Sequence, residues 1–310
     1  MTARAGATLE AVRARGAVRV AVSQGIRGLS LRGTDGRWSG LDADIARAVA
    51  AAVLADPEAV DWQPVPATAR LAVLAADETD LTVCNLTWTM GREAAHPVLF
   101  AGITCYDGEG FLVRTADGIE DPADLAGRRL AVHTGCTTPV NLEAWYGARG
   151  LTVEPVGFPD PAGAVAAYAA GDCAAYVLDR TALAGIRAGL PHPAAHRILP
   201  AAISREPMAA AVRESDPQWF RLVRWVLQLL ICAEHAEASG ADRGAAADLA
   251  GPHGPAAGVD EGWAARVLAA VGTYADVYER NLGAASGLDV PRGPNELWTR
   301  GGLHYAVPLN

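Results

Sequence analysis

The chain has 310 residues, of which 51% are hydrophobic and 20% charged, so it can bury a large core without disulfides or metals. The formal net charge of −9 argues against the basic surface that nucleic-acid binding needs. All 26 basic residues are arginine, which excludes chemistry that requires a lysine, such as the Schiff base of pyridoxal phosphate enzymes.

The N-terminus and the cysteines both bear on cellular location. No apolar stretch long enough for a signal peptide precedes the first predicted strand, and no later stretch offers the about 20 apolar residues of a membrane helix. The five cysteines form no close pair, so they do not indicate a disulfide framework: Cys84, Cys105, Cys136, Cys173 and Cys232. We therefore expect a cytoplasmic protein with no membrane partner.

The first part of the chain alternates between helix and strand patterns. A short helix is predicted over 9–16, and the elements that follow are a strand over 17–23, a helix over 41–56, a strand over 59–66, a helix over 67–79 and a strand over 80–88. In the helix over 41–56, apolar residues recur at every fourth position from Leu41 to Val53. This βαβαβ order predicts a parallel sheet covered by helices.

A second series of the same kind begins after residue 112. Its predicted elements are a strand over 129–133, a helix opening at Thr138, a strand over 151–158, a helix over 160–172, a strand over 174–179, a returning strand pair over 198–215 and helices from Asp216 onward. We expect two α/β lobes, formed by 1–112 and 113–205, with 206–310 returning to pack mainly on the first. In such folds ligands bind beyond the carboxyl ends of the strands.

One cysteine lies at the start of a predicted helix. In LAVHTGCTTPVNLEAW, residues 130–145, a strand ends near Val132, the chain turns at Gly135, and the helix begins just after Cys136. The positive end of the helix dipole lowers the pKa of a thiol in that position and stabilises the thiolate. Cys136 can therefore be a packing residue, one half of a redox pair or the reactive group of an enzyme.

Several stretches, in order along nearly the whole chain, resemble the amino-acid-binding proteins of ABC importers, in particular the broad-specificity L-amino-acid binders. They are GRWSGLDADIARAVAAAV, NLTWTMGRE, FAGITCYDGEGFLVR, TGCTTPVNL, AAYAAGDCAAYVLDRTAL, ISREPMAAAVRESDPQWFRLVRWVL and ELWTRGGLHYA. The resemblance implies the α/β, two-lobed type II periplasmic binding protein fold, with a ligand cleft between the lobes and a helical C-terminal extension.

The resemblance also implies a site for both ends of a free α-amino acid. Arg92, in TWTMGR, would hold the α-carboxylate with a bidentate guanidinium pair, beside the hydroxyl of Thr87. Asp179 would accept the α-ammonium, and backbone N–H groups of 136–138 would meet the carboxylate from the second lobe. The other residues expected to contact the substrate are Asn85, Thr137, Thr138, Leu29, Trp88 and His133.

Five positions depart from the family's usual pattern, one of them Ala131, which stands where the family often has a cysteine. Cys84 stands where an arginine is usual, and Cys136 stands where a threonine is usual. Both positions face the ligand in the family, one from each lobe. Leu29 replaces an aromatic residue that covers the ligand, and His133 replaces a glutamine.

Two cysteines on opposite sides of the α-carbon predict two-base catalysis. One thiolate would remove the α-proton while the opposite thiol returns a proton, and Arg92 and Asp179 would stabilise the charges. The main prediction is therefore an isomerase, a cofactor-independent (PLP-independent) amino-acid racemase or epimerase with Cys84 and Cys136 as the acid/base pair. We expect no cofactor, no metal and no nucleic-acid partner.

Several alternatives stay open at this point. The chain can be a non-catalytic amino-acid-binding protein that works with an ABC permease, or a lyase or dehydratase on the same fold. Cys84, Cys136 and His133 can form a three-ligand metal site, although they lack the close spacing of structural zinc sites. The two cysteines can also form a redox pair, whereas the other three cysteines are expected to be packing residues.

Overall fold

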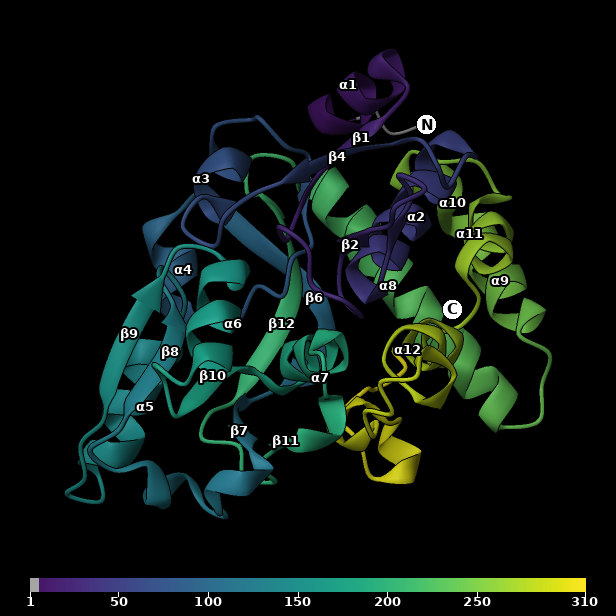
Figure 1. The fold of residues 1–310 in the computed structure, drawn as a ribbon. Coiled ribbons are helices and arrows are strands. Elements are labelled where there is room, and N and C mark those ends of the chain that lie inside the picture. The colour runs from purple at the N-terminus through teal and green to yellow at the C-terminus, as the bar shows by residue number, and fades with distance from the viewer. Residues whose placement is uncertain (1–5) are drawn as a thin grey trace.

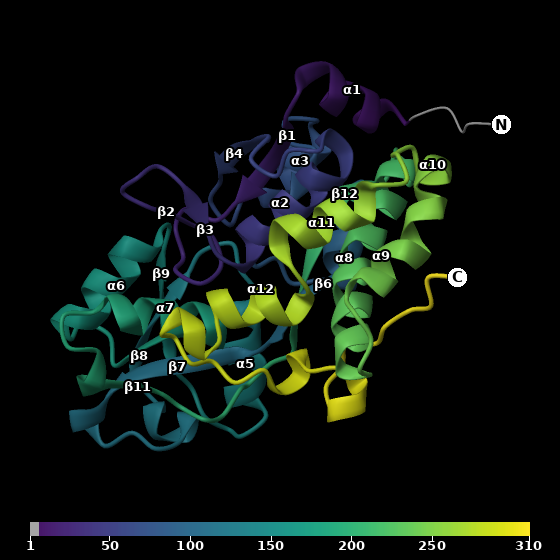
Figure 2. The same cartoon turned by 90° about the vertical axis from the view of Figure 1, so that its right-hand side faces the viewer.

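The computed structural model describes residues 6–310 and contains two five-stranded sheets covered by helices (Figures 1 and 2). The strands of the first sheet, in spatial order, are β4 (Val60–Pro64), β1 (Val18–Val22), β5 (Leu81–Thr82), β12 (Glu206–Arg213) and β6 (Val98–Asp107). The strands of the second are β11 (His196–Ile198), β7 (Glu109–Arg114), β10 (Ala175–Asp179), β8 (Arg129–His133) and β9 (Glu154–Phe158). A small ribbon pairs β2 (Leu31–Arg32) with β3 (Trp38–Ser39).

Each sheet has a parallel part and an antiparallel part. In the first sheet β1 runs parallel to β4 and β5, whereas β12 runs antiparallel to β5 and β6. In the second, β8 runs parallel to β9 and β10, and β7 runs antiparallel to β10. The parallel strands bring their carboxyl ends to one edge of each sheet, which is where ligand sites of such sheets lie.

The chain passes between the two sheets at two neighbouring places, residues 107–109 and 204–206, which we call the crossings. Glu206 is paired with Asp107 across β12 and β6, and the N–H of Ile203 donates to the carbonyl of Glu109 at 3.0 Å. The two sheets with their helices are therefore two lobes joined by a double connection.

Helices cover both sheets. Those of the first lobe and of the C-terminal extension are α1 (Ala7–Arg15), α2 (Leu41–Leu54), α3 (Arg70–Ala75), α4 (Met90–Ala95), α8 (Pro217–Ala238), α9 (Gly244–Ala250), α10 (Gly254–Ala257), α11 (Trp263–Val271) and α12 (Tyr274–Asn281). Those of the second lobe are α5 (Thr138–Gly147), α6 (Pro161–Ala170) and α7 (Arg180–Gly189). No helix within residues 6–310 has the length and apolar character needed to cross a membrane.

The alanine-rich helix α2 forms the centre of the main core. It is buried on nearly every residue because it packs against β1, α8 and α11 at once. Small side chains allow these close approaches, and Figure 2 shows the C-terminal helices α8 and α11 gathered around it. The C-terminal extension is therefore part of the first lobe's core rather than a separate appendage.

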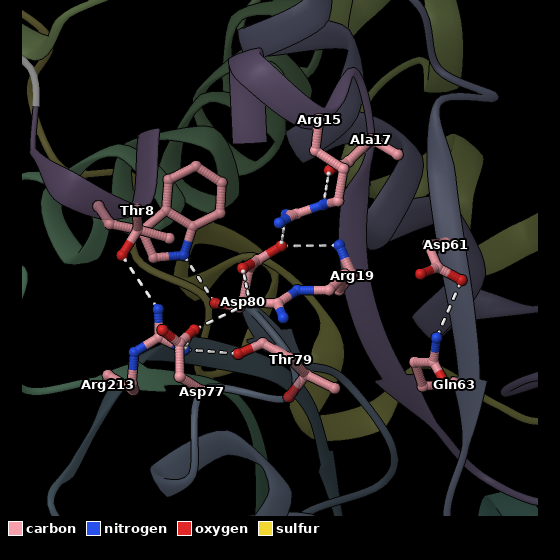
Figure 3. Close-up of polar contacts among 11 residues, drawn as sticks. Thr8, Arg15, Ala17, Arg19, Asp61, Gln63, Asp77, Thr79, Asp80 and Arg213 are labelled. Atoms are coloured by element: carbon pink, nitrogen blue, oxygen red, sulfur yellow. Dashed lines mark hydrogen bonds and ion pairs between the residues drawn. The ribbon is translucent and has the colours of Figure 1, made fainter. Parts of the chain in front are cut away.

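At the amino-terminal end of the first sheet, the carboxylate of Asp80 is the centre of an ion-pair network (Figure 3). Asp80 is 1% exposed and accepts from the guanidinium of Arg15 and, at 2.8 Å each, from the backbone N–H and Nη2 of Arg19. The indole N–H of Trp219 donates to the carbonyl of Asp80 at 2.8 Å. The network ties α1, β1 and α8 together far from the carboxyl ends of the strands.

Most predicted elements are present with boundaries shifted by a few residues. The largest difference is the predicted strand over 80–88, of which only Leu81–Thr82 pairs in the sheet. The chain then turns at Asn85, which adopts a left-handed conformation with φ 44°, and enters the region between the lobes. The lobe boundaries at 112/113 and 205/206 stay a prediction.

Candidate functional site

The two lobes touch each other at the carboxyl ends of their strands. Asn85 of the first lobe donates through Nδ2 to Oδ2 of Asp179 in the second, at 2.8 Å. Gly135 of the second lobe lies directly against Thr68 of the first, so closely that a Cβ atom added to Gly135 would lie 2.3 Å from Cγ2 of Thr68. A small pocket of about 20 Å³ lies beside these contacts, and its walls include Ser23, Arg70, His133 and Pro159. The lobes are closed on each other in this structure.

Four buried or partly buried carboxyl side chains meet at the crossings and the end of β10, and we call them the carboxyl cluster: Asp107, Glu109, Asp179 and Glu206. Asp107 accepts through Oδ2 from the hydroxyl of Thr181 at 2.6 Å. Glu206 is fully occupied by hydroxyl and amide donors of Thr87, Thr137 (3.3 Å), Asn141 (2.7 Å) and Ser204 (2.7 Å).

Glu109 differs from the other members of the cluster. Its Oε1 accepts from the hydroxyl of Thr138 at 2.6 Å, but its Oε2 is buried with no hydrogen-bond partner. A buried oxygen without a partner costs about 1–3 kcal/mol, more if it is charged. The site therefore contains an acceptor that the described residues themselves do not satisfy.

Burial raises the pKa of three members of the carboxyl cluster, Asp107, Glu109 and Asp179. Burial, together with the neighbouring carboxylates of Glu206 and Asp107, raises the pKa of Glu109 to about 8. Burial first, and then the charges of Glu109 and Asp107, raise the pKa of Asp179 well above its usual value. Burial also raises the pKa of Asp42, at the start of α2, to about 7. These groups favour the arrival of a cation.

Two arginines, Arg70 and Arg92, lie on the first-lobe side of the site, and we call them the arginine pair. Arg92 donates to the carbonyl of Thr87 at 2.6 Å, and Arg70 donates to the carbonyl of Asn85 at 3.3 Å. The Nε of Arg70 is buried and has no hydrogen-bond partner. Neither guanidinium is ion-paired with a carboxylate of residues 6–310. Burial and the charge of Arg70 lower the pKa of Arg92. The pair is free to bind an anion.

Three residues expected to contact the substrate lie elsewhere or have other partners. Leu29 is fully buried in the main hydrophobic core. Trp88 is 38% exposed and stacks on Phe100 with ring centroids 5.8 Å apart. His133 is hydrogen-bonded to the hydroxyl of Tyr176, and burial lowers its pKa to about 4, so its ring is neutral. Their roles in binding stay predictions.

Neither proposed catalytic cysteine is set up as a base. Cys84 is 1% exposed among apolar side chains such as Leu86 and Phe100, and burial raises its pKa to about 11. Cys136 donates to the carbonyl of His133 at 2.9 Å, and burial raises its pKa despite the hydrogen bonds with Thr138. The predicted lowering of the Cys136 pKa is wrong, because desolvation outweighs the helix terminus.

Metal and disulfide chemistry find no support in this geometry. All five cysteines are free. In the part of the chain that the structure describes, no group of three or more His, Cys, Asp or Glu side chains is arranged to hold a metal ion. The alternative metal site of Cys84, Cys136 and His133 is not assembled.

Five residues of this region were not predicted from the sequence: Asp42, Arg70, Asp107, Glu109 and Glu206. Glu109 and Glu206 stand on the two crossings, next to glycine or proline in DGEGF and SREPM. A charged residue on the connection between two predicted lobes is a signal that could have found them, because such a connection forms the floor of the cleft.

Comparisons with known proteins identify the family of this chain. The model of the family "Bacterial extracellular solute-binding proteins, family 3" matches residues 18–237. The general L-amino acid-binding periplasmic protein AapJ of Rhizobium johnstonii is 36% identical, over 99% of this chain and 94% of its own. The glutamate/glutamine/aspartate/asparagine-binding protein BztA of Rhodobacter capsulatus is also 36% identical, with the same coverage.

A solved structure shows the same architecture. A periplasmic binding protein of an ABC transporter from Brucella ovis, with glutathione bound, superimposes with a TM-score of 0.93 at 35% identity and covers 98% of this chain and 99% of its own. This chain belongs to family 3 of the bacterial extracellular solute-binding proteins. The predicted two-lobed type II periplasmic binding protein fold is confirmed.

These relatives overturn two predictions. The racemase, epimerase or other isomerase activity is wrong, because the relatives that match nearly the whole chain are named as binding proteins, and Cys84 lies in an apolar cluster. The cytoplasmic location is also wrong, because the family is extracellular and AapJ is named as a periplasmic protein. The second error came from two interpretations: that of the N-terminus, where no apolar stretch precedes the first strand, and that of the cysteines as a sign of a reducing compartment.

Proposed function

We propose that this protein binds a free α-amino acid between its two lobes, outside the cytoplasm, and presents it to the permease of an ABC transporter. The observation that carries this proposal is the pairing of opposite, unsatisfied groups where the lobes meet. An arginine pair without an anion faces a carboxyl cluster that has too few cations. A zwitterion supplies both missing partners at once.

Each end of the ligand has its own groups. The guanidinium groups of Arg92 and Arg70 bind the α-carboxylate, with the hydroxyl of Thr87 beside them. Asp179 accepts from the α-ammonium, and Asn85 connects it to the first lobe. Thr137 and Thr138, at the start of α5, offer backbone N–H groups to the carboxylate from the second lobe.

The lobes act as the two halves of a clamp. We take 1–112 with 206–310 as one half and 113–205 as the other, joined by the crossings. In the open state the arginine pair and Asp179 are separated, so only closure around a ligand brings its two charged ends into contact with both lobes. The names of AapJ and BztA, which are amino-acid binders, support this mode of action.

Glutathione is a second candidate ligand. The Brucella ovis protein, which superimposes on nearly the whole chain, was solved with glutathione bound. The glutamyl end of glutathione carries a free α-ammonium and a free α-carboxylate, so the same two sets of side chains can hold it. Glutathione is larger than a single amino acid, so the open cleft must supply more volume to hold it.

Isothermal titration calorimetry with the common L-amino acids and with glutathione tests the proposal. We expect at least one of them to bind, and we expect Arg92→Leu and Asp179→Asn each to weaken binding about 100-fold, since each removes one partner of a buried charged contact. Arg187→Gln, on α7, is the control and should leave the affinity unchanged. Failure of every compound to bind the wild-type protein would refute the proposal.

A further inference from the structure

We propose that Glu109 is a further ligand-binding residue, and that its free oxygen, together with Asn85 and Asp179, forms a three-oxygen site that selects a primary ammonium group. This inference rests on the proposed function and deepens it. It assigns the site a preference that none of the relatives' names state, for a ligand nitrogen that carries three protons over one that carries two.

The unpartnered oxygens of the molecule point to this site. In residues 6–310, four buried side-chain oxygens have no hydrogen-bond partner: those of Thr79, Asn85, Glu109 and Glu296. Two of the four, Oδ1 of Asn85 and Oε2 of Glu109, belong to the region where the lobes meet. Glu109 is 1% exposed and Asn85 is 9% exposed, so water cannot readily serve as their partner.

Asp179 connects these two oxygens. It accepts from Nδ2 of Asn85 at 2.8 Å, which fixes the amide by its nitrogen and leaves Oδ1 available. On the other side, Asp179 and Glu109 are direct partners across the antiparallel strands β10 and β7, so their side chains lie next to each other on one face of the sheet. The three side chains are therefore neighbours, and we infer that their oxygens face one ligand nitrogen.

The number of acceptors matches the number of donors on a primary ammonium. A protonated primary amine has three N–H donors and no acceptor, so three converging oxygens satisfy it completely. A methyl group on the nitrogen removes one donor and leaves one buried oxygen without a partner. That loss costs more than an ordinary hydrogen bond, because the orphaned oxygen belongs to a desolvated polar group.

The other two carboxyls of the cluster, Asp107 and Glu206, are not expected to bind the ammonium group. Glu206 already accepts from four donors of the protein, and Asp107 accepts from Thr181 and from its neighbour Gly108. Glu206 is also buried on a crossing, at 2% exposure, so it is a matched control for Glu109. The two residues differ mainly in whether the chain satisfies their oxygens.

The test compares each bound amino acid with its N-methyl derivative. Amino acids that raise the melting temperature of the wild-type protein are titrated by calorimetry, alongside their N-methyl forms, against wild type, Glu109→Gln and Glu206→Gln. We expect wild type to prefer the primary amine at least about 30-fold, and Glu109→Gln to reduce that preference below about tenfold. Glu206→Gln should keep the wild-type preference, whatever its affinity.

Glu109→Asp is measured in parallel, because it keeps the charge but shortens the reach by one methylene, and it should also lose the preference. If one Glu109 variant does not fold, the other decides. A wild-type preference below tenfold, or a Glu109 variant that discriminates as wild type does, would overturn the inference while amino-acid binding stands. If no amino acid binds at all, the proposed function fails, and the inference fails with it.

Discussion

Two buried acidic regions of this molecule differ in whether arginines pair with their carboxyl groups. At the amino-terminal end of the first sheet, both oxygens of Asp80 are paired with the guanidinium groups of Arg15 and Arg19 (Figure 3). Where the lobes meet, Asp179 and Glu109 are equally buried but are ion-paired with no arginine of the described chain. The chain completes the first region by itself and leaves the second incomplete.

The difference separates a structural charge from a ligand-binding charge. A buried carboxylate is tolerated when arginines and backbone N–H groups replace the water it has lost. When a buried carboxyl lacks such partners, burial raises its pKa, as it does for Glu109 and Asp179. A cation bound beside the carboxyl would lower the pKa again. Missing partners, rather than the mere presence of charge, therefore mark the site.

Removing the structural charge should have the largest effect on stability. Asp80→Asn leaves the guanidinium of Arg15 without its carboxylate and leaves Arg19 paired only with the exposed Asp77, and we expect a loss of about 3 kcal/mol in the free energy of unfolding. Urea denaturation followed by circular dichroism measures this. Glu109→Gln, which removes an unpaired carboxyl, should cost less than 1 kcal/mol. Equal losses of stability for the two variants would contradict the distinction between the paired carboxylate of Asp80 and the unpaired carboxyl of Glu109.

The pH dependence of stability should be smaller and of a specific sign. The folded-state pKa values of Glu109, about 8, and Asp42, about 7, lie above their ordinary values of 4.5 and 3.8. Between these values the folded protein holds protons that the unfolded chain has lost, so stability falls as pH rises. Without ligand, we expect the free energy of unfolding to fall steadily from pH 5 to pH 8.

Thermal denaturation over this pH range, with and without a bound amino acid, checks the sign. The other carboxyls that face Glu109 are Asp107, Asp179 and Glu206, so Glu109→Gln should make the dependence shallower without abolishing it. A ligand ammonium that pairs with these groups should also make it shallower. Stability that rises steadily from pH 5 to pH 8 would contradict the burial of unpaired carboxyls.

Local patterns of the sequence predicted much of the fold. The recurrence of apolar residues from Leu41 to Val53 gave the helix α2 within two residues, and the alternation of strands and helices gave both parallel series. The strand predicted over 80–88 pairs only as far as Thr82, and the chain then turns at Asn85, whose side chain contacts the other lobe. Such contacts have no local signature.

The site was harder to predict than the fold. Arg92 and Asp179 were predicted through a resemblance to a family and lie in the region where the lobes meet, while their roles in binding stay predictions. Cys84 and Cys136 attracted attention as residue types, but their chemistry depends on desolvation, which raised both pKa values. Glu109 was missed because its meaning arises only when the crossing places it beside Asp179.

A crystal structure of the protein with a bound L-amino acid tests the central claim most directly. We expect the α-carboxylate within hydrogen-bond distance of Arg92, and the α-ammonium within hydrogen-bond distance of Asp179 and Glu109, with both lobes in contact with the ligand. A ligand that lies outside the region between the lobes, or one whose ammonium makes no contact with either carboxyl, would contradict the account.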